Sequence, residues 1–230
     1  MSAIISLIGS KGGTGKTTLA HLLCFGLGLM GRKAVCVLTD PGRLPPPHGA
    51  LPYVSADGRD AQARQRILTT LRSREGWVGV VDGGANRLAT DMEMYRLSDL
   101  VLLPFRDSQE DLRVVCEDLK RLPNALALPT QWPSNPWQFG AAQRLLETVP
   151  AELQGRVLAP VFALSCSKQL LQHPQPSVVP TSLRKLSQAF AFQMLGLLEA
   201  DRTRLNAAQT ALGASRRLED MMENAPASVV

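Results

Sequence analysis

The residues with the clearest chemical potential form a glycine-rich stretch near the start of the chain. The stretch Ser10–Thr18 reads SKGGTGKTT and lies between an apolar run, Ile4–Ile8, and a helical pattern that starts at Leu19. A tight glycine turn lets successive backbone N–H groups point at phosphate oxygens, and the N-terminus of the following helix adds its partial positive charge. The stretch therefore predicts a loop that binds the phosphates of a nucleotide.

Individual residues of this loop have distinct predicted roles. Lys16 stands where a lysine reaches the β- and γ-phosphates, and the hydroxyl of Thr17 is placed to ligate Mg²⁺. A strand before the loop and a helix after it are the context that such a loop requires. We expect the contacts to the phosphates to come from Lys11, Gly12, Gly13, Thr14, Gly15, Lys16, Thr17 and Thr18.

A second lysine makes the loop more specific than an ordinary phosphate loop. Ser10 occupies the position of the usual first glycine, and Lys11 follows it. The arrangement Lys-Gly-Gly-x-Gly-Lys-Thr-Thr resembles the deviant Walker A motif of the ParA/MinD family. In that family the early lysine reaches across a nucleotide-sandwich dimer to the partner's phosphates. The resemblance implies that Lys11 and Lys16 are both catalytic residues, with Lys11 acting on the nucleotide of the partner. It also implies that the cofactors are ATP or ADP with Mg²⁺, and that ATP promotes a homodimer.

Composition agrees with one α/β domain in a reducing compartment. The chain has 230 residues, 45% of them apolar, which is enough to bury a substantial core. Its four cysteines are widely separated, as is typical of core residues rather than of disulfides or metal ligands. The start of the chain shows no basic segment with a cleavage site, and no apolar run reaches transmembrane length. We therefore expect a cytoplasmic protein.

Short apolar runs alternate with helical patterns along the chain. This alternation predicts an α/β fold with a mostly parallel twisted sheet covered by helices on both faces, the fold class of a P-loop NTPase of the deviant Walker A type. The expected strands are Ile4–Ile8, Ala34–Thr39, Trp77–Val81, Leu100–Phe105, Ala125–Leu128 and Val157–Ala163.

The helical patterns and the proline-rich segments complete this outline. We expect helices at Thr17–Met30, Asp60–Ser73, Ser108–Leu122, Phe139–Thr148, Thr181–Ala200 and Arg202–Met222. Caps are expected at Ser108, which Asp111 follows, and at Thr181. Pro41–Pro52 and Pro129–Pro136 are predicted to be loops. Residues 1–223 would form a single P-loop ATPase domain, and residues 224–230 a disordered tail.

Two carboxylates follow strands at the edge where ligands of parallel sheets bind. Asp40 follows the second predicted strand, and Asp82 ends the third, apolar strand. By the ParA/MinD resemblance, Asp40 would orient the attacking water, and Asp82 would hold Mg²⁺ together with Thr17. Asp40 also fits a turn aspartate before proline.

The chain departs from the family pattern around both carboxylates. Leu38 replaces the first aspartate of the family's Asp-x-Asp-Pro-Gln, and Gly42 replaces the glutamine. Gly83 and Gly84 follow Asp82 in place of Thr-Pro. Glycine makes this loop more mobile, and the N–H of Gly83 or Gly84 could still contact the γ-phosphate. We therefore expect hydrolysis to be slow. In related proteins the nucleobase lies near segments that match 128–132 and 174–180, where Trp132 or Pro176 could flank the ring or pack in the core.

Charge gives a second functional signal. The formal net charge is +5, and arginine is strongly preferred over lysine, as suits contacts to phosphates. One cluster lies on a predicted helix: Arg59, Arg64, Arg66, Arg72 and Arg74. ParA-like dimers bind DNA without sequence preference through basic residues, many of them in the C-terminal part. The resemblance implies DNA contacts from the late cluster Arg184, Lys185, Arg202 and Arg204, although an ordinary solvated surface has the same composition.

These signals favour a ParA-like ATPase that binds Mg-ATP, dimerises, and binds DNA non-specifically to partition or position DNA or other cargo. We expect a ParB-like or other adaptor to stimulate its hydrolysis, and the nucleoid to be its location. The alternatives are a MinD-like ATPase acting at the membrane and a metabolic P-loop enzyme. The last predicted helix, Arg202–Met222, is too diluted by small and acidic residues for a strong membrane anchor, so no stable membrane association is expected.

Overall fold

A seven-stranded sheet forms the centre of the computed structural model, which describes residues 2–41, 51–84, 87–162, 167, 169–172, 179–200 and 203. The strand order is β3-β2-β4-β1-β5-β6-β7, and every pair of neighbours is parallel. The strands are β1 (Ala3–Leu7), β2 (Lys33–Leu38), β3 (Val54–Asp57), β4 (Trp77–Asp82), β5 (Leu100–Phe105), β6 (Ala125–Trp132) and β7 (Val161–Phe162).

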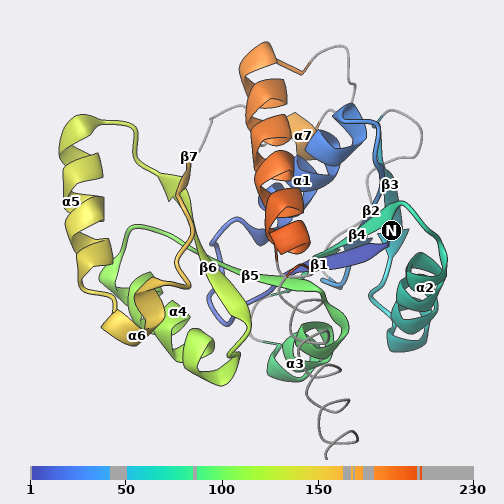
Figure 1. Ribbon diagram of the computed structural model, residues 1–230, viewed down its shortest axis with the longest axis horizontal. Helices are drawn as coiled ribbons and strands as arrows, with labels where there is room; N and C mark the ends of the chain where they lie inside the picture. The colour runs from blue at the N-terminus through green and yellow to red at the C-terminus, as the bar shows by residue number, and fades with distance from the viewer. Residues whose placement is uncertain are drawn as a thin grey trace, which may run out of the picture. The chain divides into compact units, whose positions relative to one another are not determined.

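Helices cover both faces of this sheet (Figure 1). Helix α1 lies on one face with α7, whereas α2, α3 and α4 lie on the other. The helix at residues 181–200 begins beside α1, where the Ser187 carbonyl lies against Gly26. The helices are α1 (Lys16–Leu29), α2 (Ala61–Ser73), α3 (Leu88–Leu97), α4 (Gln109–Arg121), α5 (Pro136–Glu147), α6 (Ala151–Gln154) and α7 (Gln169–Gln172). The predicted α/β class with a parallel, doubly covered sheet is confirmed.

The central strands are buried along their whole length because both of their faces are covered. Every residue of β1 and of β5 is buried, which explains why their sequences are continuous apolar runs rather than alternating patterns. Strand β1 pairs with β4 on one side and with β5 on the other. The segment that follows β1 therefore lies next to the segments that follow β4 and β5.

The cap predicted at Ser108 is confirmed, and a second cap lies at Asp60, the predicted start of a helix. The Asp60 side chain accepts from the Ala63 amide at 2.8 Å, so α2 starts one residue after the predicted start. The Ser108 side chain accepts from the Asp111 amide at 3.1 Å, as expected of an N-cap. Residues 181–200 are helical as predicted. The predicted helix Arg202–Met222 and the tail at 224–230 lie outside the described residues, apart from residue 203.

Several predicted boundaries were wrong for physical reasons. Pro129 to Trp132 continues β6 instead of forming a loop, since each residue of a parallel strand directs its N–H to one side only and a proline removes a single ladder donor. Helix α5 begins at Pro136, earlier than predicted, because Asn135 caps it and proline is well suited to the first turn. The last predicted strand is reduced to β7 and a bridge at Val157.

Four of the described elements were not predicted: β3, α3 and the two four-residue helices α6 and α7. Strand β3 is a short edge strand whose residues are partly exposed, so it lacks a continuous apolar run. Helix α3 begins after a residue that makes no side-chain cap, and it buries only Asp91 and Met94, so its sequence carries weak helical periodicity. Within the predicted loop Pro41–Pro52, residues 42–50 lie outside the described residues.

The chain divides into two compact units, 1–192 and 193–230. The candidate site lies in the first unit, and only residues 193–200 and 203 of the second are described. The expectation of a single domain over 1–223 stays a prediction. Among the described helices, none combines the length and the apolar character needed to cross a membrane.

Candidate functional site

The glycine-rich loop lies between β1 and α1, at the carboxyl edge of the sheet. Gly15 is the N-cap of α1 and has φ +82°, a left-handed conformation that side chains rarely adopt. A Cβ at this position would also lie 3.1 Å from Nε2 of Gln131, which stands near the end of β6. Gln131 itself has φ +53° and is the one described non-glycine residue with a positive φ. The loop and the end of β6 thus approach each other closely.

Lys16 folds back into the loop. Its ammonium group donates to the Gly9 carbonyl at 3.1 Å and to the Lys11 carbonyl at 2.7 Å, and its side chain is buried. Burial lowers its pKa, while the negative charges of Asp91 and Asp82 act in the opposite direction. This lysine therefore holds a positive charge at the centre of the loop.

The two predicted Mg²⁺ ligands lie side by side. The Thr17 hydroxyl donates to Oδ1 of Asp82 at 3.0 Å, so a hydroxyl and a carboxylate from α1 and β4 converge on one point. Asp82 is completely buried at the end of its strand. Hydroxyl and carboxylate oxygens are the ligands that Mg²⁺ takes in proteins, usually together with waters and phosphate oxygens. The residues therefore fit the metal that the loop implies.

Asp40 lies at the same edge. Strands β2 and β4 are neighbours in which Leu38 pairs with Asp82, so Asp40 lies two residues beyond that register. The Thr39 hydroxyl donates to the Asp82 carbonyl at 2.8 Å, which ties the two strand ends together. The negative charge of Asp40 also acts on Lys16. The structure thus brings Asp40, Asp82 and the loop lysine into one neighbourhood.

The predicted contact from Gly83 needs a correction. The Gly83 amide donates to the Leu7 carbonyl at 2.9 Å, because the chain continues the pairing of β4 with β1 for one more residue. This amide is therefore not available to a phosphate. Gly84 is the remaining candidate of the two glycines.

Acidic residues on α3 and α4 accept hydrogen bonds from the loop, and the sequence analysis did not identify them. Asp118 accepts from the Ser10 amide at 2.9 Å and from the Ser10 hydroxyl at 2.7 Å. Asp91 accepts from the Gly9 amide at 3.3 Å. These residues lie 82 and 108 positions away from the loop, so no local pattern pointed to them. Ser10 was a signal, since a serine at a glycine position predicts a partner for its hydroxyl.

Asp91 is a buried carboxyl group with a raised pKa. Its side chain is buried, and its Oδ1 atom has no hydrogen-bond partner among the described residues. Burial raises its pKa from 3.8 to about 6, although the Gly9 amide and Lys16 oppose the rise. The carboxyl therefore titrates close to neutral pH.

Lys11 lies against the N-terminus of α4 in its own chain. Its ammonium group is 3.5 Å from Oε1 of Glu110 and 3.9 Å from Oδ1 of Asp111. Arg113, and then Lys11, hold the pKa of the Glu110 carboxyl below its ordinary value. To contact the phosphates of a partner, Lys11 would first have to break its contacts with Glu110 and Asp111.

In the segment 128–132, expected near a nucleobase, every residue is buried except Gln131. Trp132 is in the core, where its ring meets Phe105 edge-on with 6.2 Å between the centroids, so it packs instead of flanking a base. Gln131 is exposed beside the loop. Pro176 lies outside the described residues.

The basic residues expected to contact DNA are only partly described. Arg184 and Lys185 are exposed on the helix at 181–200, whereas Arg202 and Arg204 lie outside the described residues. Three of the five arginines in the other cluster are paired with acids within the chain. Its ion pairs are Arg59 with Asp57 at 2.5 Å, Arg64 with Glu93 at 2.5 Å and Arg72 with Asp99 at 2.6 Å. Arg74 stacks over Trp77. The three arginines that are paired with acids are therefore poor candidates for phosphate contacts.

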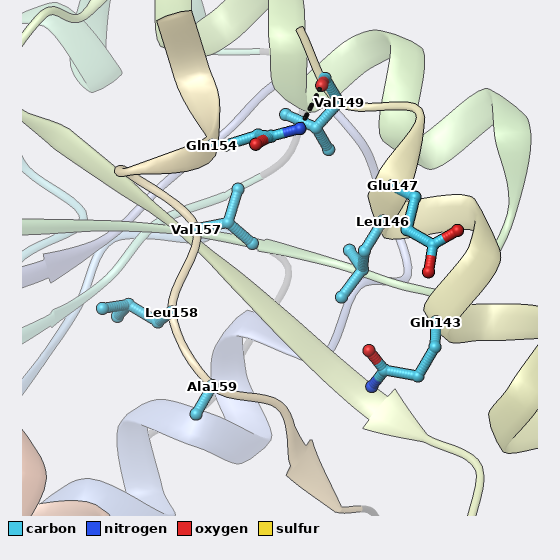
Figure 2. Close-up of a pocket in the computed structure, with 8 residues that line it drawn as sticks. All are labelled: Gln143, Leu146, Glu147, Val149, Gln154, Val157, Leu158 and Ala159. Carbon is cyan, nitrogen blue, oxygen red and sulfur yellow. Dashed lines mark hydrogen bonds between the residues drawn. The ribbon is translucent and has the colours of Figure 1, made fainter. Parts of the chain in front are cut away.

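A separate hollow of about 390 Å³ lies between α5 and the segment that follows α6 (Figure 2). Figure 2 shows Leu146 and Glu147 from α5 on one side and Leu158 and Ala159 on the other. The lining has one acidic side chain and no lysine or arginine. It therefore does not suit the phosphates of a nucleotide, and the site at the loop remains the candidate.

Comparison with known proteins places this geometry in a known fold. No protein-family model matches the sequence, and no match was found among the curated proteins. The cell division ATPase MinD from Pyrococcus furiosus is 19% identical, with a TM-score of 0.59 over 86% of this chain and 100% of that one. MinD from Pyrococcus horikoshii, complexed with Mg-ADP, is 18% identical, with a TM-score of 0.58 over 84% and 96%.

A protein of Borrelia burgdorferi assigned to plasmid partition and bound to AMPPNP is 13% identical, with a TM-score of 0.58 over 84% of this chain and 99% of that one. The chain has the fold of the MinD and plasmid-partition ATPases. The resemblance predicted from Lys11 and the loop is confirmed at the level of the fold. The chemistry of this chain rests on its own residues.

Proposed function

We propose that this chain is a ParA-like ATPase, which binds Mg-ATP, dimerises, and positions or partitions DNA or other cargo. The observation that carries the proposal is the loop with two lysines at the carboxyl end of β1, in which Lys16 is buried within the loop and Lys11 is partly exposed beside Glu110. A monomeric phosphate site needs only Lys16, not Lys11. The fold shared with MinD and plasmid-partition ATPases supports the same function.

In the proposed complex the loop amides and Lys16 bind the phosphates. Thr17 and Asp82 would hold Mg²⁺, whose chemistry is to neutralise charge on the β- and γ-phosphates. The bonds from Lys16 to the Gly9 and Lys11 carbonyls would give way to phosphate contacts. Asp40 would orient the attacking water. We expect slow hydrolysis, which an adaptor protein of the ParB type would stimulate.

The first test of the proposal is the dependence of mass on nucleotide. Light scattering should give a dimer with ATP and a monomer with ADP for the wild type. Lys11→Ala should bind ATP as a monomer, whereas the control Lys33→Ala, at the opposite edge of the sheet, should dimerise normally. An unchanged dimer in Lys11→Ala would show that Lys11 has no role in trans.

We further propose that the ATP-bound dimer binds DNA without sequence preference and is associated with the nucleoid. Exposed Arg184 and Lys185 support this proposal, together with Arg202 and Arg204 from the sequence. Each neutralised phosphate releases counterions, so the logarithm of affinity should fall linearly with the logarithm of salt. Alanine at these four positions should flatten the slope by about one per lost contact. The control replaces four exposed arginines elsewhere: Arg66, Arg74, Arg96 and Arg144.

Two of the three solved structures described above are of MinD, so membrane association is the competing outcome. Co-sedimentation with DNA and with anionic liposomes, each with ATP, separates the two. Pelleting with liposomes and not with DNA would replace the DNA proposal by a MinD-like one. Equal slopes for wild type and the quadruple variant would show that the four residues are only a solvated surface.

A further inference from the structure

We infer that Arg87 is a positioning residue of the ATPase site, which clamps the ends of β2 and β4 and so fixes the turn that carries Asp40. The inference rests on the proposed ATPase function. Arg87 precedes α3, and its guanidinium donates through Nη1 to the Thr39 carbonyl, 48 residues earlier in the chain. Thr39 is completely buried and directly precedes Asp40.

The clamp has two further hydrogen bonds in the same place. The Thr39 hydroxyl and amide donate to the Asp82 carbonyl at 2.8 and 3.2 Å. Thr39 therefore links the end of β2, next to Asp40, to Asp82 at the end of β4, and the Arg87 side chain attaches the start of α3 to the same residue. Since these two carboxylates are the acids proposed for water and Mg²⁺, their separation depends on this link.

Gly84 provides the space that the arginine crosses. A Cβ at position 84 would lie 2.7 Å from Cδ of Arg87, closer than any real contact, so a side chain there would displace the arginine. A Gly-Gly turn is flexible by itself, because glycine loses the most conformational freedom on folding. The guanidinium clamp compensates for this flexibility by attaching the start of α3 to the end of β2.

The charge of Arg87 also acts on a residue that contacts the loop. An arginine is always ionised, and Arg87 acts electrostatically on Asp91, which contacts the loop at Gly9. Its positive charge therefore lies at the phosphate edge of the sheet in the same chain. It provides this edge with a fixed cation that does not depend on a second protomer.

The test compares Arg87→Met and Arg87→Lys with a control on the same helix, Arg96→Met, whose residue is exposed in the last turn of α3. Calorimetry gives ATP affinity, and single-turnover hydrolysis at saturating ATP gives the rate. We expect Arg87→Met to bind ATP within about threefold of wild type and to hydrolyse it at least tenfold more slowly, as misplacement of a reacting group by about 1 Å costs up to a hundredfold. Lysine, which keeps one donor, should restore part of the rate.

Hydrogen exchange of the nucleotide-free protein gives a second readout. Loss of a charged hydrogen bond should speed the exchange of amides around Thr39 and Asp40 by about tenfold or more in Arg87→Met and leave Arg96→Met unchanged. If Arg87→Met does not fold, Gly84→Ala takes its place, because it displaces the arginine and keeps the charge. A rate and an exchange profile within twofold of wild type would overturn the inference. A wild type that binds no ATP would overturn the proposed function, and the exchange profile would then decide the clamp by itself.

Discussion

Asp91 allows a prediction whose size follows from the structure. Its pKa is raised from 3.8 to about 6, chiefly by burial. The folded protein therefore binds more protons than the unfolded chain between about pH 4 and pH 6, and its free energy of unfolding falls as the pH rises through this window. A tenfold difference in proton affinity corresponds to about 1.4 kcal/mol, so the ionised carboxylate costs the fold about 3 kcal/mol at neutral pH.

Asp91→Asn removes this cost. Asparagine keeps an oxygen that accepts from the Gly9 amide and resembles the protonated acid in shape, so the variant should match wild type near pH 4. At pH 7 it should be more stable by up to about 3 kcal/mol, or roughly 6 to 12 °C in Tm for a chain of this size. Thermal unfolding of the nucleotide-free protein from pH 4 to pH 8 measures the difference.

The exposed Glu147→Gln is the matched control, because it makes the same change of charge on α5. The difference in stability between Glu147→Gln and wild type should not increase comparably between pH 4 and pH 6. If Asp91→Asn is less stable than wild type at pH 7, or if its advantage does not change with pH, Asp91 is ionised at no cost and the reasoning from burial fails.

Three further substitutions test the loop and its surroundings. Lys16→Ala should abolish ATP and ADP binding in calorimetry, because the phosphate charge loses its buried cation; wild-type affinity would exclude the assignment of the loop. Asp40→Ala should bind ATP and keep the dimer but hydrolyse at least about a hundredfold more slowly, and a parental rate would place the water-orienting role elsewhere. Asp118→Ala removes both bonds to Ser10 and should weaken ATP binding about tenfold, whereas an unchanged Kd would show that Asp118 does not hold the loop.

Local rules explain why the phosphate loop could be read from the sequence. Gly13 and Gly15 have positive φ values, which glycine adopts far more readily than other residues. The strand before the loop and the helix after it directly adjoin the loop in the sequence. The buried strands were equally legible, since a parallel strand covered on both faces must be apolar throughout. Asp82 was found in the same way, as a carboxylate at the end of an apolar strand.

The surroundings of the loop depended on the order of the strands. Because β1 lies between β4 and β5, the helices that follow those two strands bring Asp91 and Asp118 under the loop from distant parts of the chain. The same order engages the Gly83 amide with Leu7 and brings Arg87 to Thr39. Composition cannot encode such pairings.

The sequence by itself determined the phosphate loop, the alternation of strands and helices, and the acids at the ends of strands, because each is a property of a few consecutive residues. Only the tertiary structure decided which charged side chains form ion pairs and which are buried. It paired Arg64 with Glu93 and Arg72 with Asp99, placed Lys11 beside Glu110, and buried Asp91 with an unbonded oxygen. A charge acts over the distance to its neighbours in space, and those neighbours are set by the crossovers between strands.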